Sequence, residues 1–516
     1  MIARSAQCLL SVWVAVTGFA TGAPAVAVLG SPDQRSGVAA PNNDDRRERR
    51  AERKNDRQRA DGKKDDRRAK STKDGRDGKN ERDKAADEDR DRLQERRESR
   101  QDDPRLSALD EDDADDADGF DDDDGFPPLI DDDDDATTDG FRAQQAIVRL
   151  KPGTNIDNYA DRHDADVAAA IPAQNLYLLD LPGAVTDPVR LGPLRNDART
   201  VWVELNYGHQ APEGRPGRFF LSATPVSPQD AAAAEPPAAL GIADAWSCAT
   251  GDGAVVAVLD TGFDAAHPEL AGRIVAGGRN VLANRPNTSD VGNGIDDDGD
   301  GLVDEMTGHG THVAGIIAQV APDAGLLPIK VLDSDGVGDA FYVAAGIYRA
   351  IDRGAEVINL SLGSTHDALV IAEAVRAAHD AGIVVFAAAG NADRDLPPEY
   401  PATDRHAFGV AATDANDVKS GYSNYHARLL LSAPGNDVIS AFPGGGYAAW
   451  SGTSMATPWV AGAAALLLEM NPNRTVNQVG TRLAATADPI PNHDPRYDGL
   501  LGAGRLDVGA ATACSD

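Results

Sequence analysis

The chain is poor in cysteine and lacks long uncharged apolar segments. Only three of its 516 residues are Cys. After the N-terminal apolar stretch, no segment reaches the roughly 18 uncharged apolar residues that a membrane-spanning helix needs. The zinc-protease pattern HEXXH is also missing, and no cluster of Cys and His residues offers a zinc site. We therefore expect neither a membrane anchor nor a zinc centre.

Residues 1–27 are typical of a secretory signal peptide. Arg4 supplies a positive start, residues 8–19 form a short apolar run, and residues 25–27 offer a small-residue cleavage site. A buried N-terminal helix is the alternative. Export would remove Cys8 and leave Cys248 and Cys514 in an oxidising compartment, either as one disulfide or as two buried free thiols. We predict a secreted protein, extracellular or periplasmic.

A charged arm follows the signal. Apolar residues are nearly absent from residues 45–100, and residues 110–135 hold 16 acidic residues and no basic one. Such a composition cannot bury enough apolar surface to offset chain entropy, so residues 28–145 are predicted to be disordered. Interleaved acidic residues cancel much of the basic field, which argues against a nucleic-acid partner. The aspartate run could bind cations loosely, but a solvated spacer is the preferred interpretation.

Two folded regions are predicted after the arm. Residues 146–207 form a small α+β unit, with strands at 146–153, 176–182 and 200–207 and a helix at 155–169. A linker rich in Pro, Gly and Ala covers residues 208–239.

In residues 240–516, buried strands alternate with helices. Continuous apolar runs at 254–260, 326–333, 356–363 and 383–391 indicate strands buried on both faces, and helical spacing follows at 341–354 and 367–382. The predicted fold class is α/β, a parallel sheet with helices on both faces. In such sheets the reacting groups lie beyond the carboxyl ends of the strands.

Three polar residues stand at ends of these elements. Asp260 ends the first strand, His309 opens a helix, and Ser454 is expected to be exposed at another helix start. Each has an ordinary interpretation alone: a turn Asp, a hydrogen-bonded polar His and a helix-capping Ser. Their order along the chain, however, is the order of the triad in subtilisin.

The segments VLDTG, GHGTHVAG and GTSMATP resemble the three signatures of the subtilisin-like serine proteases, the subtilases. The resemblance covers about residues 240–513. It implies that Ser454 is the nucleophile, that His309 accepts its proton, and that Asp260 orients the imidazole. It also implies an oxyanion site made by the Ser454 N–H and the Asn391 side chain, although Asn391 alone could be a turn residue.

The resemblance carries further expectations. Ser361, Leu362 and Gly363 match the family's edge strand for peptide substrates. Residues 146–207 resemble its propeptide, so we expect a zymogen whose partners are its own propeptide and protein or peptide substrates, with the processing site in residues 208–239. Asp395 could favour a basic substrate residue, but a surface charge is the preferred interpretation. The alternative function is a catalytically idle subtilase fold that binds peptides or a surface partner.

An acidic loop precedes His309. Asp296, Asp298 and Asp300 alternate before Gly301, like the first half of a calcium loop. The carbonyl of Leu302 and the carboxylate of Asp304 complete the predicted calcium site. The loop is not an EF-hand, because Thr307 stands where the bidentate Glu belongs. A solvated acidic turn is the alternative.

Overall fold

The structure, a computed structural model, describes residues 140–183, 191–215, 223–233, 236–490 and 494–514. The predicted signal peptide and the charged arm up to residue 139 lie outside these residues. In the described part of the chain, no helix has both the length and the apolar character needed to cross a membrane.

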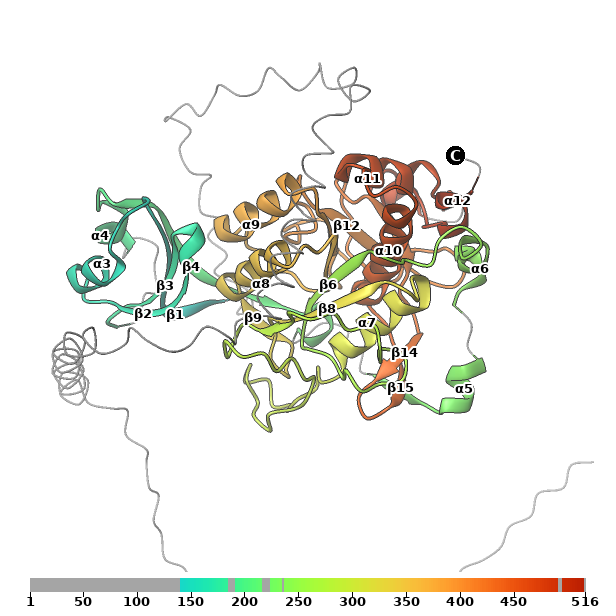
Figure 1. Cartoon of the computed structure of the whole chain (residues 1–516), viewed down its shortest axis with the longest axis horizontal. Coiled ribbons are helices and arrows are strands. Elements are labelled where there is room, and N and C mark those ends of the chain that lie inside the picture. Colours follow the sequence, from blue (N-terminus) through green and yellow to red (C-terminus); the bar gives the residue numbers. More distant parts are fainter. Residues whose placement is uncertain (1–139, 184–190, 216–222, 234–235, 491–493, 515–516) are drawn as a thin grey trace, which may run out of the picture. The chain divides into compact units, whose positions relative to one another are not determined.

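The first described region is an antiparallel sheet with two helices. Its elements are β1 (Phe141–Leu150), α3 (Ile156–Arg162), β2 (Asp166–Ile171), β3 (Leu176–Asp180), α4 (Gly192–Arg195) and β4 (Thr200–Gln210). The strand order is β2-β3-β1-β4, and β9 (Val337–Asp339), from much later in the chain, extends the sheet beyond β4 (Figure 1). Inward apolar side chains of β1, β3 and β4 pack with Tyr159 in a core of their own.

Two boundaries differ from the sequence expectation. Strand β1 begins at Phe141, ahead of residue 146, because Phe141 still pairs with Tyr207 of β4. The helix expected over residues 155–169 ends at Arg162. Asp164 then adopts a left-handed conformation with φ of 53°, and residues 166–171 pair with β3 as a strand. Tertiary pairing thus overrides the local helical pattern.

The second region is built on a seven-stranded sheet of order β13-β12-β11-β10-β6-β8-β7, in which every neighbouring pair is parallel. Its strands are β6 (Val255–Asp260), β7 (Arg279–Asn280), β8 (Gly325–Lys330), β10 (Val357–Leu360), β11 (Val384–Ala388), β12 (Phe408–Thr413) and β13 (Leu431–Pro434). Residues of β6, β10 and β11 are almost all buried, as the continuous apolar runs predict. The predicted α/β class is confirmed.

Four long helices cover this sheet. They are α7 (His309–Val320), α8 (Ala340–Asp352), α9 (Leu369–Asp380) and α10 (Thr453–Met470). Helices α8 and α9 pack together on one face, and α7 packs with α10 on the other (Figure 1). The mostly apolar α10 is buried over residues 453–468 and crosses beneath β10 to β13.

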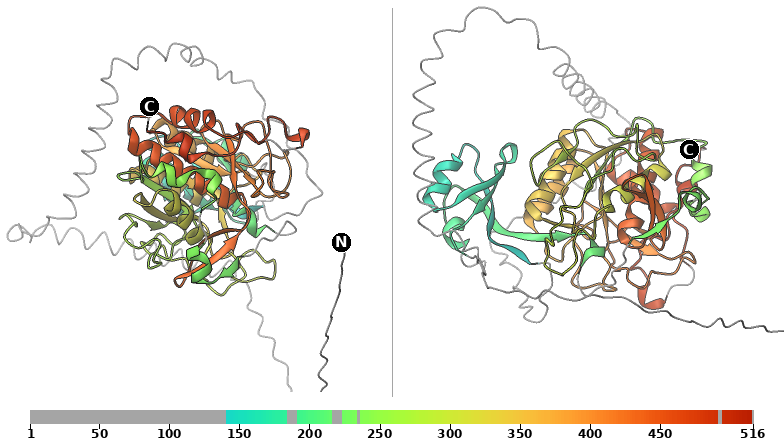
Figure 2. Two further views of the ribbon diagram at one scale, coloured as in Figure 1. Left: turned by 90° about the vertical axis from the view of Figure 1, so that its right-hand side faces the viewer. Right: turned by 90° about the horizontal axis from the view of Figure 1, so that it is seen from below.

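Smaller elements complete the domain. They are the antiparallel sheet β14-β15-β5 (Val438–Phe442, Gly446–Trp450, Thr224–Val226), helices α5 (Pro228–Ala233), α6 (Ile242–Ala245), α11 (Val476–Ala485) and α12 (Val508–Ala511), and the 3₁₀ turns Pro212–Gly214, Ala238–Leu240 and Pro495–Tyr497. A further 3₁₀ turn, Pro172–Gln174, lies between β2 and β3 of the first region. Helix α12 packs against α6, so the two ends of the domain meet (Figure 2).

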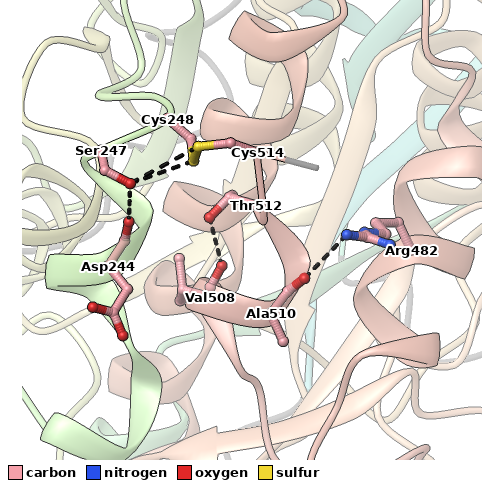
Figure 3. Close-up of a disulfide and its surroundings, with 8 residues drawn as sticks. All are labelled: Asp244, Ser247, Cys248, Arg482, Val508, Ala510, Thr512 and Cys514. Carbon is pink, nitrogen blue, oxygen red and sulfur yellow. Dashed lines mark hydrogen bonds between the residues drawn. A yellow bond between two sulfur atoms is a disulfide. The ribbon is translucent and has the colours of Figure 1, made fainter. Parts of the chain in front are cut away.

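A disulfide closes this meeting of the two ends. Cys248, just after α6, is bonded to Cys514, just after α12, and their Cα atoms are 5.5 Å apart (Figure 3). Of the two states left open by the sequence, the structure therefore contains the bonded one. The bond lies at the surface, since Cys514 is exposed.

Candidate active site

Three predicted catalytic side chains meet beyond the carboxyl ends of the parallel strands. Asp260 is the last residue of β6, His309 is the first of α7, and Ser454 is the second of α10. Nδ1 of His309 lies 2.7 Å from Oδ1 of Asp260. That carboxylate oxygen also accepts the Thr261 N–H at 2.7 Å, which fixes the carboxylate toward the imidazole. All three catalytic candidates are fully buried.

Asn391 follows β11 and points into the same site. Its Oδ1 accepts hydrogen bonds from the N–H and the hydroxyl of Thr453, at 3.0 and 2.9 Å. Because the oxygen is taken, the Nδ2 group faces the Ser454 side of the site. The side-chain amide and the main-chain N–H of Ser454 thus converge on one point, as donors for an oxyanion must.

That point is occupied by Glu213, a residue that the sequence interpretation missed. Its Oε1 accepts from Asn391 Nδ2 at 2.8 Å and lies 3.4 Å from the Ser454 nitrogen. Its Oε2 accepts the Ser454 hydroxyl at 2.7 Å and lies 3.3 Å from Nε2 of His309. Ser454 is consequently buried, whereas the sequence predicts an exposed serine: the Glu213 carboxylate covers it.

Glu213 reaches the site through the last residues of β4 and the chain that follows them. We call residues 208–215 the occluding segment. Gly208–Gln210 pairs with β9, and the main-chain groups of Gln210 exchange hydrogen bonds with Gly363 at 3.0 and 3.1 Å. Ala211 donates to the Gly336 carbonyl at 2.9 Å. The 3₁₀ turn Pro212–Gly214 then turns the Glu213 side chain toward Ser454.

The predicted substrate edge lies against this segment. Ser361, Leu362 and Gly363 follow β10 and are buried. Gly363 carries the pairing with Gln210, and the Ser361 carbonyl is 3.3 Å from the Ser454 hydroxyl. The Ser361 hydroxyl donates to the Ser454 carbonyl at 2.9 Å, so this residue also supports the start of α10. An extended chain segment is thus seated on the edge that the sequence assigns to peptides.

The charges in the site depend on one another. Burial lowers the pKa of His309, but the carboxylates of Asp260 and Glu213 outweigh it and raise that pKa to about 10. Burial raises the pKa of Glu213, and the hydrogen bond and charge of His309 outweigh that effect and lower it. At neutral pH the site therefore holds a protonated imidazole between two carboxylates. An imidazolium cannot accept the proton of Ser454.

Two clusters of carboxylates form in the acidic loop. Asp296 and Asp298 gather with Asp335, and Asp298 also gathers with Asp300 and Glu305, with ligand oxygens within 4.8 Å of one another in each cluster. Burial, together with the charges of neighbouring carboxylates, raises the pKa of Glu305 to about 8. Both Glu305 oxygens are buried without a hydrogen-bond partner from another residue. This donor set suits a hard cation bound by oxygen ligands.

Of the five predicted ligands, the two clusters contain Asp296, Asp298 and Asp300. Asp304 lies outside both clusters, because its left-handed conformation, with φ of 59°, directs its carboxylate to the N–H groups of Asn293 and Gly294. Leu302, the other predicted ligand, is exposed in the same loop. Asp335 and Glu305 belong to the clusters instead. Glu305 is adjacent in sequence and could have been suspected, but Asp335 comes from a separate loop.

Known proteins with similar sequences decide the family. Residues 251–504 match the profile of the subtilase family, Peptidase S8. Thermitase from Thermoactinomyces vulgaris is 40% identical over 277 residues, which cover 52% of this chain and 92% of thermitase. The chain belongs to the subtilase family. Like the proteases to which it is similar, this subtilase is a serine endopeptidase.

Other relatives agree. Subtilisin BL from Lederbergia lenta is 40% identical to this subtilase over 272 residues, covering 51% of this chain and 92% of subtilisin BL. Among solved structures, fervidolysin from Fervidobacterium pennivorans, described as a keratinolytic enzyme related to subtilisin, is similar with a TM-score of 0.59 and 25% identity. That match covers 73% of this chain and 62% of fervidolysin.

Proposed function

We propose that Asp260, His309 and Ser454 are the catalytic triad of this endopeptidase, with Asn391 and the Ser454 N–H as its oxyanion donors. One observation carries the proposal. The hydroxyl and N–H of Ser454, the Asn391 amide and the His309 imidazole all face one pair of carboxylate oxygens. Such convergent donors suit the negative oxygen of a tetrahedral intermediate, and an idle peptide-binding fold has no need of them.

The chemistry follows from these positions once Glu213 has left. Neutral His309 accepts the Ser454 proton at Nε2 while Oγ attacks the substrate carbonyl carbon. The carbonyl oxygen becomes negative and is stabilised by Asn391 Nδ2 and the Ser454 N–H. His309 then gives its proton to the leaving amine, and the C–N bond breaks to leave an acyl-enzyme. Water, deprotonated by His309, hydrolyses the ester and restores Ser454.

A serine-directed fluorophosphonate tests the triad. Processed enzyme should be labelled at Ser454, and Ser454→Ala should abolish both labelling and peptide hydrolysis. Ser451→Ala is the matched control, because Ser451 lies three residues earlier, before α10 begins, and its hydroxyl accepts the Asp437 N–H. Labelling that persists in Ser454→Ala would refute the assignment.

We further propose that the chain is a self-processing zymogen, in which residues 140–215 act as its propeptide. Support comes from the occluding segment, which pairs along the substrate edge and covers Ser454. The preceding sheet is anchored to the enzyme: the Glu204 carboxylate accepts the N–H groups of Leu369 and Val370 at the start of α9, both at 2.8 Å. The Ser454→Ala precursor should remain uncut. Mature-sized protein from this variant in a protease-deficient host would exclude self-processing.

Calcium binding in the acidic loop and secretion are also part of the proposal. The two carboxylate clusters and the unpartnered oxygens of Glu305 support a hard divalent cation, held by Asp296, Asp298, Asp300, Glu305 and Asp335. Bound there, the ion would neutralise mutually repelling carboxylates and so stabilise the connection between β6 and α7. The signal-like residues 1–27 and the disulfide support export.

A further inference from the structure

A buried carboxylate, that of Glu399, lies beside the oxyanion donors. Its side chain is 1% exposed. A Cβ atom added at Gly363 would lie 2.5 Å from its Oε1, and one added at Gly390 would lie 2.9 Å from its Oε2. Gly363 belongs to the substrate edge, and Gly390 directly precedes Asn391. The carboxylate therefore stands between the strand that holds a peptide and the amide that would hold the oxyanion.

We call the site bounded by the Glu399 carboxylate, Gly363 and Gly390 the Glu399 pocket. An arginine side chain of the same chain occupies it. Arg215, 5% exposed, donates from one guanidinium nitrogen to Glu399 Oε2 at 3.0 Å, and its other terminal nitrogen donates to Oε1. The latter nitrogen also donates to the Gly363 carbonyl at 2.8 Å. The fork of the guanidinium thus matches two carboxylate oxygens and one carbonyl, a geometry that no other side chain can reproduce.

Arg215 does not enter the pocket as part of the paired strand. The extended pairing ends at Ala211, and the turn at residues 212–214 brings the chain back, with the Glu213 carboxylate where a substrate carbonyl would lie. A bound substrate would instead continue its extended strand past Ser454. Because the pocket adjoins Asn391, the side chain that enters it would belong to the residue whose carbonyl is attacked.

We propose that Glu399 makes this endopeptidase selective for arginine immediately before the scissile bond. The inference rests on the proposed role of Ser454. A neutral residue would leave a buried carboxylate without a partner, which costs more than the lost contact alone. Lysine would supply the charge but only a single point donor, so it ranks below arginine. Asp395, the carboxylate considered from the sequence, is exposed and does not line the Arg215 contact.

The test uses processed enzyme and tripeptide p-nitroanilides Gln-Ala-X, which copy Gln210 and Ala211 of the occluding segment. X is arginine, lysine, leucine or citrulline, the last being a neutral analogue of arginine with nearly the same shape. We expect kcat/KM for arginine to exceed those for leucine and citrulline by at least about 100-fold, and that for lysine by about 10-fold. Leucine or citrulline hydrolysed as well as arginine would overturn the proposal.

Glu399→Gln should reduce the arginine-to-leucine ratio by at least about 100-fold, whereas Asp395→Asn should keep the wild-type ratio. An unchanged ratio in Glu399→Gln would refute the role of Glu399. If Glu399→Gln does not fold, the wild type can be tested with agmatine, a small molecule that carries a guanidinium. We expect agmatine to inhibit hydrolysis of the leucine peptide competitively, and no inhibition would overturn the proposal. Cleavage of the leucine peptide but not of the arginine peptide would refute the proposed specificity and leave the proposed triad intact. A Ser454 that does not react with fluorophosphonate would contradict the triad itself.

Discussion

Replacing Glu213 with Gln removes one negative charge from the closed site and keeps the length of the side chain. The carboxylate accepts hydrogen bonds from Ser454 and Asn391 and pairs with protonated His309. A hydrogen bond to a charged group contributes about 1.5–3 kcal/mol, and truncating a buried charge pair costs about 2–5 kcal/mol. We call the site closed when Glu213 covers Ser454 and open when Glu213 has left it. We expect Glu213→Gln to destabilise the closed state relative to the open state by about 3 kcal/mol, which makes the open state roughly 150-fold more populated.

The pH dependence gives this prediction a second readout. With Glu213 in place, the pKa of His309 is raised to about 10, against an ordinary value of about 6.5. Asp260 stays beside His309 after Glu213 has left, so only the part of this rise that Glu213 causes is linked to closure. That part stabilises closure fully below the pKa of His309 in the open site, and it is lost as pH rises through about 10. The lowered pKa of Glu213 means that closure is also lost as pH falls through that pKa.

Fluorophosphonate labelling of freshly folded, unprocessed chain measures the open fraction, and intact mass separates labelled precursor from processed enzyme. Wild-type labelling should accelerate from pH 7 to pH 9 much more than labelling of processed enzyme does. Glu213→Gln should label about 100-fold faster at pH 7 with the pH dependence of processed enzyme. Glu269→Gln is the matched control, because Glu269 is exposed and its carboxylate accepts a hydrogen bond from the Tyr447 hydroxyl, away from Ser454. Equal labelling of wild type and Glu213→Gln would refute the reasoning.

Three further perturbations have definite expected outcomes. Removal of one oxyanion donor in subtilisin lowers kcat by roughly 100- to 1,000-fold, and we expect that family value for Asn391→Ala, measured with peptide substrates at unchanged folding; unaltered kcat would remove Asn391 from the site. Chelation of calcium should lower the Tm of the Ser454→Ala protein, and Asp298→Ala should reduce the rise in Tm that added calcium produces. If magnesium raises the Tm as much as calcium does, the loop is an acidic turn and not a calcium site. Replacing Cys248 and Cys514 by Ser should destabilise the domain by up to about 5 kcal/mol, read as a lower Tm, since the bond spans 266 residues; an unchanged Tm would contradict this.

The proposed catalytic residues could be singled out from the sequence because their neighbourhoods are local. Asp260, His309, Asn391 and Ser454 each stand at the end of a strand or the start of a helix, and parallel strands bring such ends to one edge. Buried runs of β-branched residues likewise marked the central strands. Local pattern failed at residues 166–171, where pairing with β3 turned a helical-looking segment into a strand.

The remaining site residues depend on the path of the chain in three dimensions. Glu213 and Arg215 lie in a segment that reads as a linker, and only the pairing of β4 with β9 brings them to Ser454. Similarly, Glu399 and Asp395 are four residues apart in one loop, and spacing alone does not reveal which one turns inward. Asp335 joins the acidic loop from beyond β8, a neighbour that no local motif indicates.

The bond between Cys248 and Cys514 turns nearly the whole catalytic domain into a covalent ring. Asp260, His309 and Ser454 all lie inside it. A protease at high concentration is exposed to its own activity, and surface loops are the usual places where chains are nicked. One cut within a ring opens it but separates nothing, so a nicked molecule keeps both pieces joined. Such damage would be invisible on a denaturing gel until a reductant is added, when two fragments would appear.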